Sequence, residues 1–414
     1  MSLGNYKELN AAKTAIIVTT LFIALCGFSS IDLSWSGWGS RQSFYIGVFL
    51  FIYVLFNIKN IDKGEMTNVT GWTLMSAFLS IIPAFIDWNA TFRSFFYTFV
   101  ATYYGLFFYY LLRIWKVSPQ EIIRIVCIFC LVWVVLEIGQ QFTYPQYWFL
   151  GRRNELDYVE NRMGLWRFYI WGIDLVMLAF AYYAGKFFDG NNSKKTFFYA
   201  IVFAVGILCY CSRKHIISLL AVCAWGILKT KSKHKWKLRF TSILLLSLLF
   251  FNFYADFAQM SAEQDEAQGT GEDFIRYLAA LFYLNDFSDS PLYPILGTGW
   301  GSTILDHRLE YCTNVLGFYR ADIGLLGYYS SVGIVGASAI LLYVYKFVKN
   351  WKYIDFGYKM FFAMKIFLII FDFWMSWAIG IIAYGTFLYL LDENIKLNIK
   401  KKNEHRNPNI LQGC

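Results

Sequence analysis

Residues 121–139 read EIIRIVCIFCLVWVVLEIG, an apolar run long enough to cross the roughly 30 Å hydrocarbon core of a membrane as a helix. The run is preceded by Ser118, Pro119 and Gln120, which together with Glu121 make a typical helix start. Serine favours the cap, proline the first helical position, and Glu121 can close a capping box. We therefore predict a membrane-spanning helix that begins at this point.

Comparable apolar runs follow one another along the whole chain. Hydrophobic residues make up 57% of the 414 residues and charged residues only 16%, whereas a soluble domain would carry roughly a quarter charged residues. We therefore predict an all-α polytopic membrane protein that forms a single membrane domain over residues 1–414, with about twelve transmembrane helices. The predicted spans are 12–30, 43–58, 71–87, 94–115, 121–139, 168–187, 196–210, 214–229, 239–257, 321–345, 359–374 and 376–391.

The distribution of lysine predicts how the chain is oriented. Residues 229–239 read KTKSKHKWKLR, and a segment this basic is retained on the cytoplasmic side. With this segment inside, both termini and the basic tail 392–414 are also cytoplasmic. The two long connections between spans, 140–167 and 258–320, then both face outward.

Arginine has the opposite distribution to lysine. The predicted cytoplasmic segments hold 21 lysines and 4 arginines, whereas the outer side holds 1 lysine and 10 arginines. Guanidinium groups grip phosphate or carboxylate through two parallel hydrogen bonds, which lysine cannot do. The arginines either pair with neighbouring carboxylates such as Glu155, Asp157 and Glu160 or bind an anionic ligand, and we favour the ligand for the set as a whole. They are Arg41, Arg93, Arg152, Arg153, Arg162, Arg167, Arg213, Arg276, Arg308 and Arg320.

Several residues on the predicted outer side lie at spacings that can be compared with known sequence motifs. Gly164 follows Arg153 by eleven positions, and the same segment ends in Arg162-Met-Gly164. Ser212-Arg213 is a Ser-Arg pair between two spans. In the second long connection, Arg276 is followed by residues 294–301, which read PILGTGWG, and Asp322 is eleven positions before Gly333.

In this order and at these places, the motifs resemble those of the bacterial O-antigen polymerase and O-antigen ligase superfamily. The resemblance implies a GT-C-like membrane glycosyltransferase at the periplasmic face of the inner membrane. Such an enzyme polymerises undecaprenyl-diphosphate-linked repeat units into O-antigen, capsule or exopolysaccharide with inversion at the anomeric carbon. It implies contact with membrane lipid, a flippase and a chain-length regulator, with no cofactor, no metal and no nucleic acid.

The resemblance also implies roles for individual residues. Arg153, Arg162, Arg276 and Asp322 would be catalytic, and Arg152, Arg213, Arg320, His307 and Glu160 would bind substrate. Ligases carry histidine where this chain has Asp322, which favours a polymerase. Asp322, Glu160 and His307 are all candidates for the general base, and Asp322 is also placed to cap the following helix. A ligase that transfers glycan to lipid A core and a non-enzymatic flippase remain the alternative functions.

Two further features are open to more than one interpretation. Asp174 and Lys365 fall inside apolar spans, where ionisable groups are costly, so they either pair with each other or serve a function. Residues 270–285 carry apolar side chains at helical spacing over a length too short for a span. We predict an interfacial helix there that holds Arg276 at headgroup depth, a helix packed on its own loop being the alternative.

Overall fold

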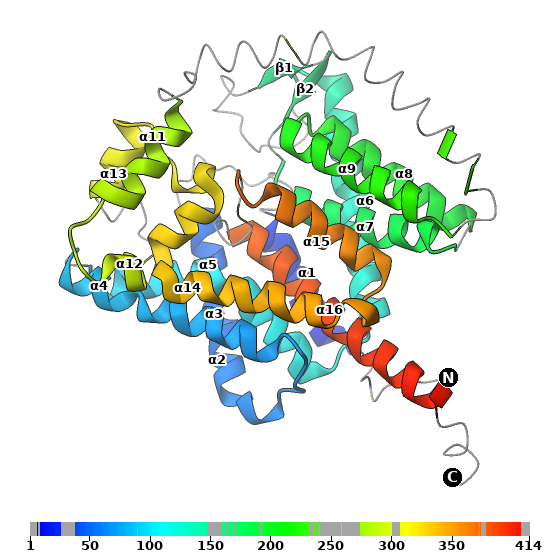
Figure 1. Cartoon of the computed structure of the whole chain (residues 1–414), viewed down its shortest axis with the longest axis horizontal. Helices are drawn as coiled ribbons and strands as arrows, with labels where there is room; N and C mark the ends of the chain where they lie inside the picture. The colour runs from blue at the N-terminus through cyan, green and yellow to red at the C-terminus, as the bar shows by residue number, and fades with distance from the viewer. Residues whose placement is uncertain are drawn as a thin grey trace.

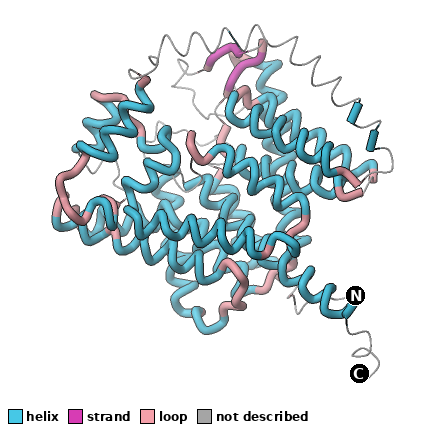
Figure 2. Tube along the Cα trace, in the orientation of Figure 1, coloured by secondary structure: helices cyan, strands magenta, loops and turns pink. Residues whose placement is uncertain are grey.

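The computed structural model describes residue 6 and the ranges 9–25, 38–88, 90–146, 159–162, 164–168, 170–190, 193–231, 235–236, 239–240, 258, 274–299, 307–371, 373 and 378–406. This part of the chain is almost entirely helical, with one two-stranded hairpin (Figure 2). Up to the hairpin the elements are α1 (Ala11–Ala24), α2 (Trp38–Phe56), a 3-10 turn η1 (Ile58–Asn60), α3 (Thr67–Leu79), α4 (Ile81–Ile86), α5 (Phe92–Trp115) and α6 (Pro119–Thr143).

The antiparallel hairpin joins β1 (Glu160–Arg162) to β2 (Leu165–Arg167), with Glu160 opposite Arg167. After it come α7 (Ile173–Phe188), α8 (Lys194–Cys209), α9 (Arg213–Lys229), α11 (Ile275–Leu281), a π-helical turn η4 (Phe282–Asp286), α12 (Tyr293–Leu296) and α13 (His307–Asn314). The chain ends with η5 (Arg320–Ile323), α14 (Gly324–Lys349), η6 (Trp351–Tyr353), α15 (Phe356–Leu368) and α16 (Ala378–Arg406) (Figure 1).

Helices occupy eleven of the twelve predicted spans, and 239–257 lies outside the described residues apart from its first two. Within the described part, 4 stretches are long and apolar enough to cross a membrane: Thr67–Ile86, Phe92–Trp115, Pro119–Thr143 and Arg320–Lys349. Ala11–Ala24 and Gln42–Phe56 are apolar but shorter. The protein therefore has the helices of a membrane protein, while the twelve-span topology stays a prediction.

One detail of the predicted helices is wrong. Helix α6 begins at Pro119 as expected, but the Ser118 side chain makes no capping hydrogen bond, and its hydroxyl donates instead to Oε1 of Gln120 at 2.8 Å. The predicted capping box is therefore not formed. Helix α16 runs through to Arg406, so the last helix continues into the predicted basic tail.

Glycines allow the central helices to approach closely. Helix α5 packs against α2 and α16, and a Cβ atom on Gly105 would lie only 2.3 Å from the carbonyl oxygen of Ile381. A Cβ on Gly385 would lie 1.9 Å from the carbonyl oxygen of Gly105. These helices therefore touch backbone to backbone, as small residues permit in membrane helix packing.

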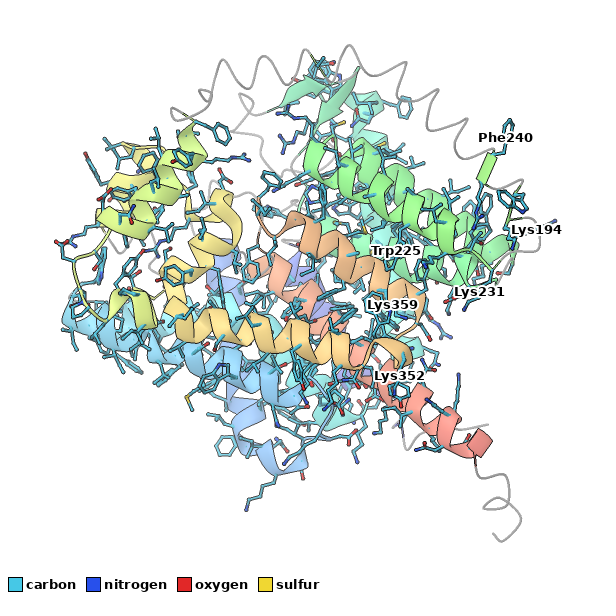
Figure 3. The ribbon with its side chains drawn as sticks, viewed as in Figure 1. Lys194, Trp225, Lys231, Phe240, Lys352 and Lys359 are labelled. Atoms are coloured by element: carbon cyan, nitrogen blue, oxygen red, sulfur yellow. The ribbon has the colours of Figure 1, made fainter. Side chains whose placement is uncertain are left out.

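Four lysine side chains lie at one end of the molecule, the lysine-rich end. Figure 3 labels Lys194, Lys231, Lys352 and Lys359 on its right side, the side toward which α16 runs to its C-terminal end. Helices α11 and α13 lie on the opposite side (Figure 1). The cytoplasmic placement of the lysines and the orientation relative to a membrane stay predictions.

A buried ionic network holds α16 at the lysine-rich end. The side chain of Arg113, near the end of α5, is 0% exposed; its Nη2 lies 3.2 Å from Oδ2 of Asp62 and its Nη1 pairs with Glu393. Lys396 adds a contact of 2.9 Å to Asp62. Burial alone would raise the pKa of Asp62, but the hydrogen bond from Lys396 and the charge of Arg113 outweigh it, and the pKa lies below its usual value. The guanidinium is thus balanced by ionised carboxylates.

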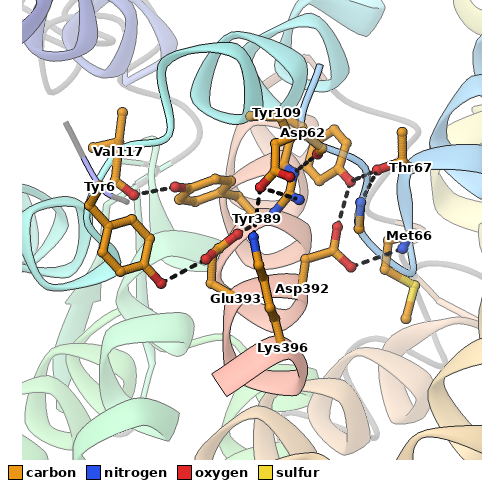
Figure 4. Close-up of polar contacts among 12 residues, drawn as sticks. Tyr6, Asp62, Met66, Thr67, Tyr109, Val117, Tyr389, Asp392, Glu393 and Lys396 are labelled. Carbon is orange, nitrogen blue, oxygen red and sulfur yellow. Dashed lines mark hydrogen bonds and ion pairs between the residues drawn. The ribbon is translucent and has the colours of Figure 1, made fainter. Parts of the chain in front are cut away.

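Asp392 and Glu393 extend this network to other segments (Figure 4). The Tyr109 hydroxyl donates to Asp392 at 2.5 Å, and the backbone N–H of Met66 donates to the same carboxylate at 2.9 Å. The Tyr6 hydroxyl donates to Glu393 at 2.7 Å, so residue 6 is joined to the last helix. The network therefore connects α3, α5, α16 and the N-terminal segment.

Replacing Arg113 with methionine should destabilise the protein strongly, because Glu393 and Asp62 would lose the cation that compensates their burial. We expect Arg113→Met to lower the free energy of unfolding by about 3–5 kcal/mol. The control, Lys396→Met, removes an amine whose side chain is 59% exposed and should cost less than about 1 kcal/mol. Denaturant unfolding of both variants in detergent measures the difference, and equal costs would contradict a structural role for Arg113.

Candidate functional site

The described part of the second long connection is a folded unit with its own core. Helix α11, the η4 turn, α12 and α13 pack around a cluster separate from the main core: Ala279, Tyr283, Phe287, Tyr293, Leu309, Cys312 and Ile323. The Tyr283 hydroxyl donates to the carbonyl of Phe318 at 2.9 Å and so fixes the chain just before η5. Residues 274–286 form helical turns as predicted. Ala279 and Tyr283 pack into the core of this unit, whereas Leu278 and Leu281 of the predicted apolar face are 39% and 37% exposed, so the interfacial placement stays a prediction.

The glycine-rich segment of this unit docks onto an interruption in α14. Gly333 has φ 62° and breaks the helical backbone, which leaves the carbonyls of Ser330 and Ser331 available. They accept the backbone N–H groups of Thr298 and Gly299 at 3.1 and 2.8 Å. A Cβ atom on Gly333 would lie 2.2 Å from the carbonyl oxygen of Ile295, so only glycine permits this contact. Two motifs that are more than thirty residues apart in the sequence therefore meet.

Arg320 reaches into this junction from the η5 turn. Its Nη2 donates to Oγ1 of Thr298 at 2.7 Å, and its Nη1 donates to the carbonyl of Gly299 at 3.2 Å and lies 3.5 Å from Oγ of Ser331. The guanidinium carbon lies 4.7 Å from the ring centre of Phe287 and 5.3 Å from that of Tyr283. The residue is only 8% exposed, and its Nε has no hydrogen-bond partner in the described part of the chain.

The charge of Arg320 is not balanced by any described carboxylate. All of its hydrogen-bond acceptors are neutral oxygens, and the two rings are neutral as well. Burial raises the pKa of Tyr293 to about 12 although Arg320 opposes the shift, and it raises the pKa of Tyr283 in the same way. Neither phenol can therefore supply a negative charge at physiological pH. A buried guanidinium in this condition is a ready binding group for an anion.

Asp322 lies on the same turn but faces outward. It is exposed, whereas Arg320 and Ile323 on either side are buried. The residue in the cap position of α14 is Ile323, and no side chain makes a capping hydrogen bond there. The interpretation of Asp322 as a helix cap is therefore wrong, because the η5 turn places its carboxylate before and outside the first turn of α14.

The other predicted site residues fall into three groups. Arg276 is half-buried on α11, which contacts η5, so it belongs to the same unit as Arg320. Arg213 is half-buried at the start of α9, a helix that is not part of that unit. Of Arg162, Glu160 and His307 only the backbone is described, and Arg152 and Arg153 lie outside the described residues.

The hairpin that carries Glu160 and Arg162 is anchored to the end of α6. The side-chain amide of Gln141 donates to the carbonyl of Trp166 at 2.6 Å and accepts the backbone N–H of the same residue at 2.8 Å. This paired contact fixes β2 against α6. The end of the first long connection is therefore an ordered hairpin that is hydrogen-bonded to α6.

Two buried ionisable groups, Glu137 and His215, were missed by the sequence analysis. Glu137 is 0% exposed and neither of its carboxylate oxygens has a described hydrogen-bond partner, and the same holds for Nε2 of His215, which is 2% exposed. An ionisable residue inside an apolar run is the signal that could have identified both. Asp174 and Lys365 do pair with each other, joining α7 to α15.

Comparison with models of known protein families and with curated proteins found no match for this chain. Within the described residues, no three His, Cys, Asp or Glu side chains come together in a way that could hold a metal ion. The geometry of the site itself, above all that of Arg320, therefore indicates its chemistry.

Replacing Arg320 with methionine should have little effect on stability, in contrast to the change at Arg113. The Ser331 hydroxyl keeps its bond to Gly327 at 3.0 Å and Thr298 keeps its backbone contacts, so no partner is left unsatisfied. We expect Arg320→Met to change the free energy of unfolding by less than about 1.5 kcal/mol. A loss as large as that expected for Arg113→Met, measured in the same denaturant series, would show that Arg320 is a structural cross-link.

Proposed function

We propose that this protein is a membrane glycosyltransferase that polymerises lipid-diphosphate-linked oligosaccharides on the outer face of the membrane. The observation that supports the proposal most directly is Arg320, a buried cation whose described hydrogen-bond acceptors are all neutral oxygens and whose Nε–H has no described partner. A diphosphate would supply the missing negative charge. The apolar helices support a setting in a bilayer, where such a substrate is found.

The proposed reaction exchanges one bond at the anomeric carbon for another. The acceptor sugar hydroxyl attacks that carbon and forms the new C–O bond, while the bond to the diphosphate oxygen breaks and the lipid diphosphate leaves with the electron pair. Guanidinium groups at the diphosphate stabilise the charge that develops as this bond breaks. Arg320 fills this role in the proposal, with Arg276 of the same unit beside it, and attack opposite the leaving group inverts the anomeric carbon.

The proton of the attacking hydroxyl needs an acceptor. Asp322 is suited to this because it is exposed, lies two residues from Arg320 and makes no capping hydrogen bond to α14. A carboxylate on the solvent side of the turn can meet a glycan that approaches from outside, while Arg320 on the inner side meets the diphosphate. The η5 turn would thus present the base and the cation in opposite directions.

Arg320→Lys and Arg276→Lys should both abolish long glycans, because lysine keeps the charge but cannot make the two-pronged contact to phosphate oxygens. We expect turnover to fall by about 10²–10³-fold for Arg320→Lys, the usual effect of losing one donor to a developing negative charge. The measurement is the length distribution of lipid-linked glycan in cells that carry each variant at matched protein level. Arg308→Lys is the control, since Arg308 is exposed on α13 and stacks on Trp88 at 4.7 Å. Wild-type chain lengths in Arg320→Lys would contradict the proposal.

Asp322→Asn should stop turnover without affecting folding. Asparagine is nearly isosteric with aspartate but cannot accept the proton, and no capping bond is lost. Asp322→Ala should for the same reason cost less than the roughly 0.5–2 kcal/mol of a lost cap. Glycan chain length and the thermal unfolding midpoint of each variant test the two parts. If the Asn variant makes chains of normal length, Asp322 is not the base.

A further inference from the structure

His215 is the buried polar side chain that the proposed reaction does not yet use. It lies in the first turn of α9 and is 2% exposed. Its Nδ1 is 2.8 Å from Oγ of Ser212, and its ring packs edge-on against Tyr210 with the ring centres 5.5 Å apart. The other ring nitrogen, Nε2, has no hydrogen-bond partner among the described residues. The ring is therefore held in place from one side while its second nitrogen is left unused.

The charges that act on this ring are positive. They come from Lys214 beside it on α9, from Lys365 on α15 and from Arg167 on β2. Asp174, at the start of α7, is the carboxylate that pairs with Lys365. Three helices and the hairpin thus bring ionisable groups to one place. Ionisable groups inside a membrane helix bundle are costly and usually serve a function.

The Ser212 hydroxyl can either donate to Nδ1 or accept a hydrogen from it, so the 2.8 Å contact is compatible with both tautomers of the ring. The positive surroundings favour an anionic partner, and such a partner requires the tautomer in which Ser212 donates to Nδ1 and Nε2 carries the ring hydrogen as an unused donor. Leaving a buried donor unsatisfied is costly, and a ligand that supplies the acceptor removes that cost. Because the surrounding charges are positive, an anionic oxygen such as that of a phosphate suits the position best.

We propose that the ends of α7, α9 and α15 around His215 form a second anion-binding site, which takes the phosphate groups of a lipid diphosphate. The inference rests on the proposed function, because joining two lipid-linked glycans requires two lipid diphosphates to be held at once. The two sites are connected through α15, since the carbonyl of Ile369, one turn beyond Lys365, accepts the backbone N–H of Leu325 at 2.9 Å. Leu325 is in the first turn of α14, which follows the η5 turn of Arg320.

Binding stoichiometry tests this inference. The full chain is placed in phosphatidylcholine nanodiscs and titrated with farnesyl diphosphate by calorimetry, with farnesol as the probe that lacks phosphate. We expect two equivalents bound to the wild type, one to His215→Leu, which has no donor at the Nε2 position, one to Arg320→Met, and none of farnesol. Lys229→Met, at the opposite end of α9, is the control and should still bind two. The affinity of the His215-dependent equivalent should fall about tenfold or more in His215→Leu.

A second variant separates loss of the site from loss of the fold. His215→Asn keeps a polar group near Ser212 but has no atom at the Nε2 position, and it should also bind one equivalent with an unchanged unfolding midpoint. Two equivalents in both His215 variants, or a single wild-type equivalent that Arg320→Met removes, would overturn the inference. Loss of one equivalent in phosphatidylglycerol nanodiscs, dependent on His215, would overturn it too, because a bilayer headgroup would then occupy the site. Two equivalents in Arg320→Met with one in His215→Leu would refute the proposed role of Arg320 alone.

Discussion

A guanidinium that leaves water for the interior of a helix bundle loses hydration free energy that only ion pairs or hydrogen bonds can restore. Arg113 and Arg320, the buried arginines in the described part of the chain, meet that constraint in different ways. Arg113 has the carboxylates of Asp62 and Glu393 within contact and is part of a network that holds α16 in place. The described partners of Arg320 are three neutral oxygens and two neutral rings. Arg113 is a structural cross-link, and for Arg320 we propose the binding of an anion.

The positions of these arginines follow from the helices that carry them. The backbone N–H of Met66, the residue before α3, donates a hydrogen bond to Asp392. Helix α4, which follows α3, contacts α12. The Arg113 network and the Arg320 junction are therefore at opposite ends of the same helical pair. The break in α14 at Gly333 leaves two carbonyls that accept hydrogen bonds from the glycine-rich segment at Thr298 and Gly299. The same segment supplies oxygen acceptors to Arg320. The break therefore supplies backbone hydrogen bonds that join the loop unit to α14, and the stacking of Phe287 on Trp88 at 4.7 Å joins the unit to the residues after α4.

Local features of the sequence predicted the fold better than they predicted the site. Apolar runs located the helices, and Pro119 located the start of α6, because both signals depend on neighbouring residues. The glycines at 297, 299 and 333 were singled out, but their meeting across α14 is a long-range contact that no local pattern contains. Arg113 was counted only as a charge on the cytoplasmic side, although it is fully buried. His215 could have been noted as an ionisable residue in an apolar run, but its environment, which is assembled from α7, α9, α15 and the hairpin, is contained in no local pattern.

In the proposed function, the protein lengthens lipid-linked glycans at a site built around Arg320. The decisive experiment deletes the gene in its host and separates the lipid-linked glycans by size, with the wild-type gene and the Arg320→Met variant each reintroduced for comparison. We expect single repeat units on the lipid in the deletion strain and with Arg320→Met, and long chains with the wild type. Long chains that accumulate on the lipid in the deletion strain would contradict it, because polymerisation would then proceed without this protein.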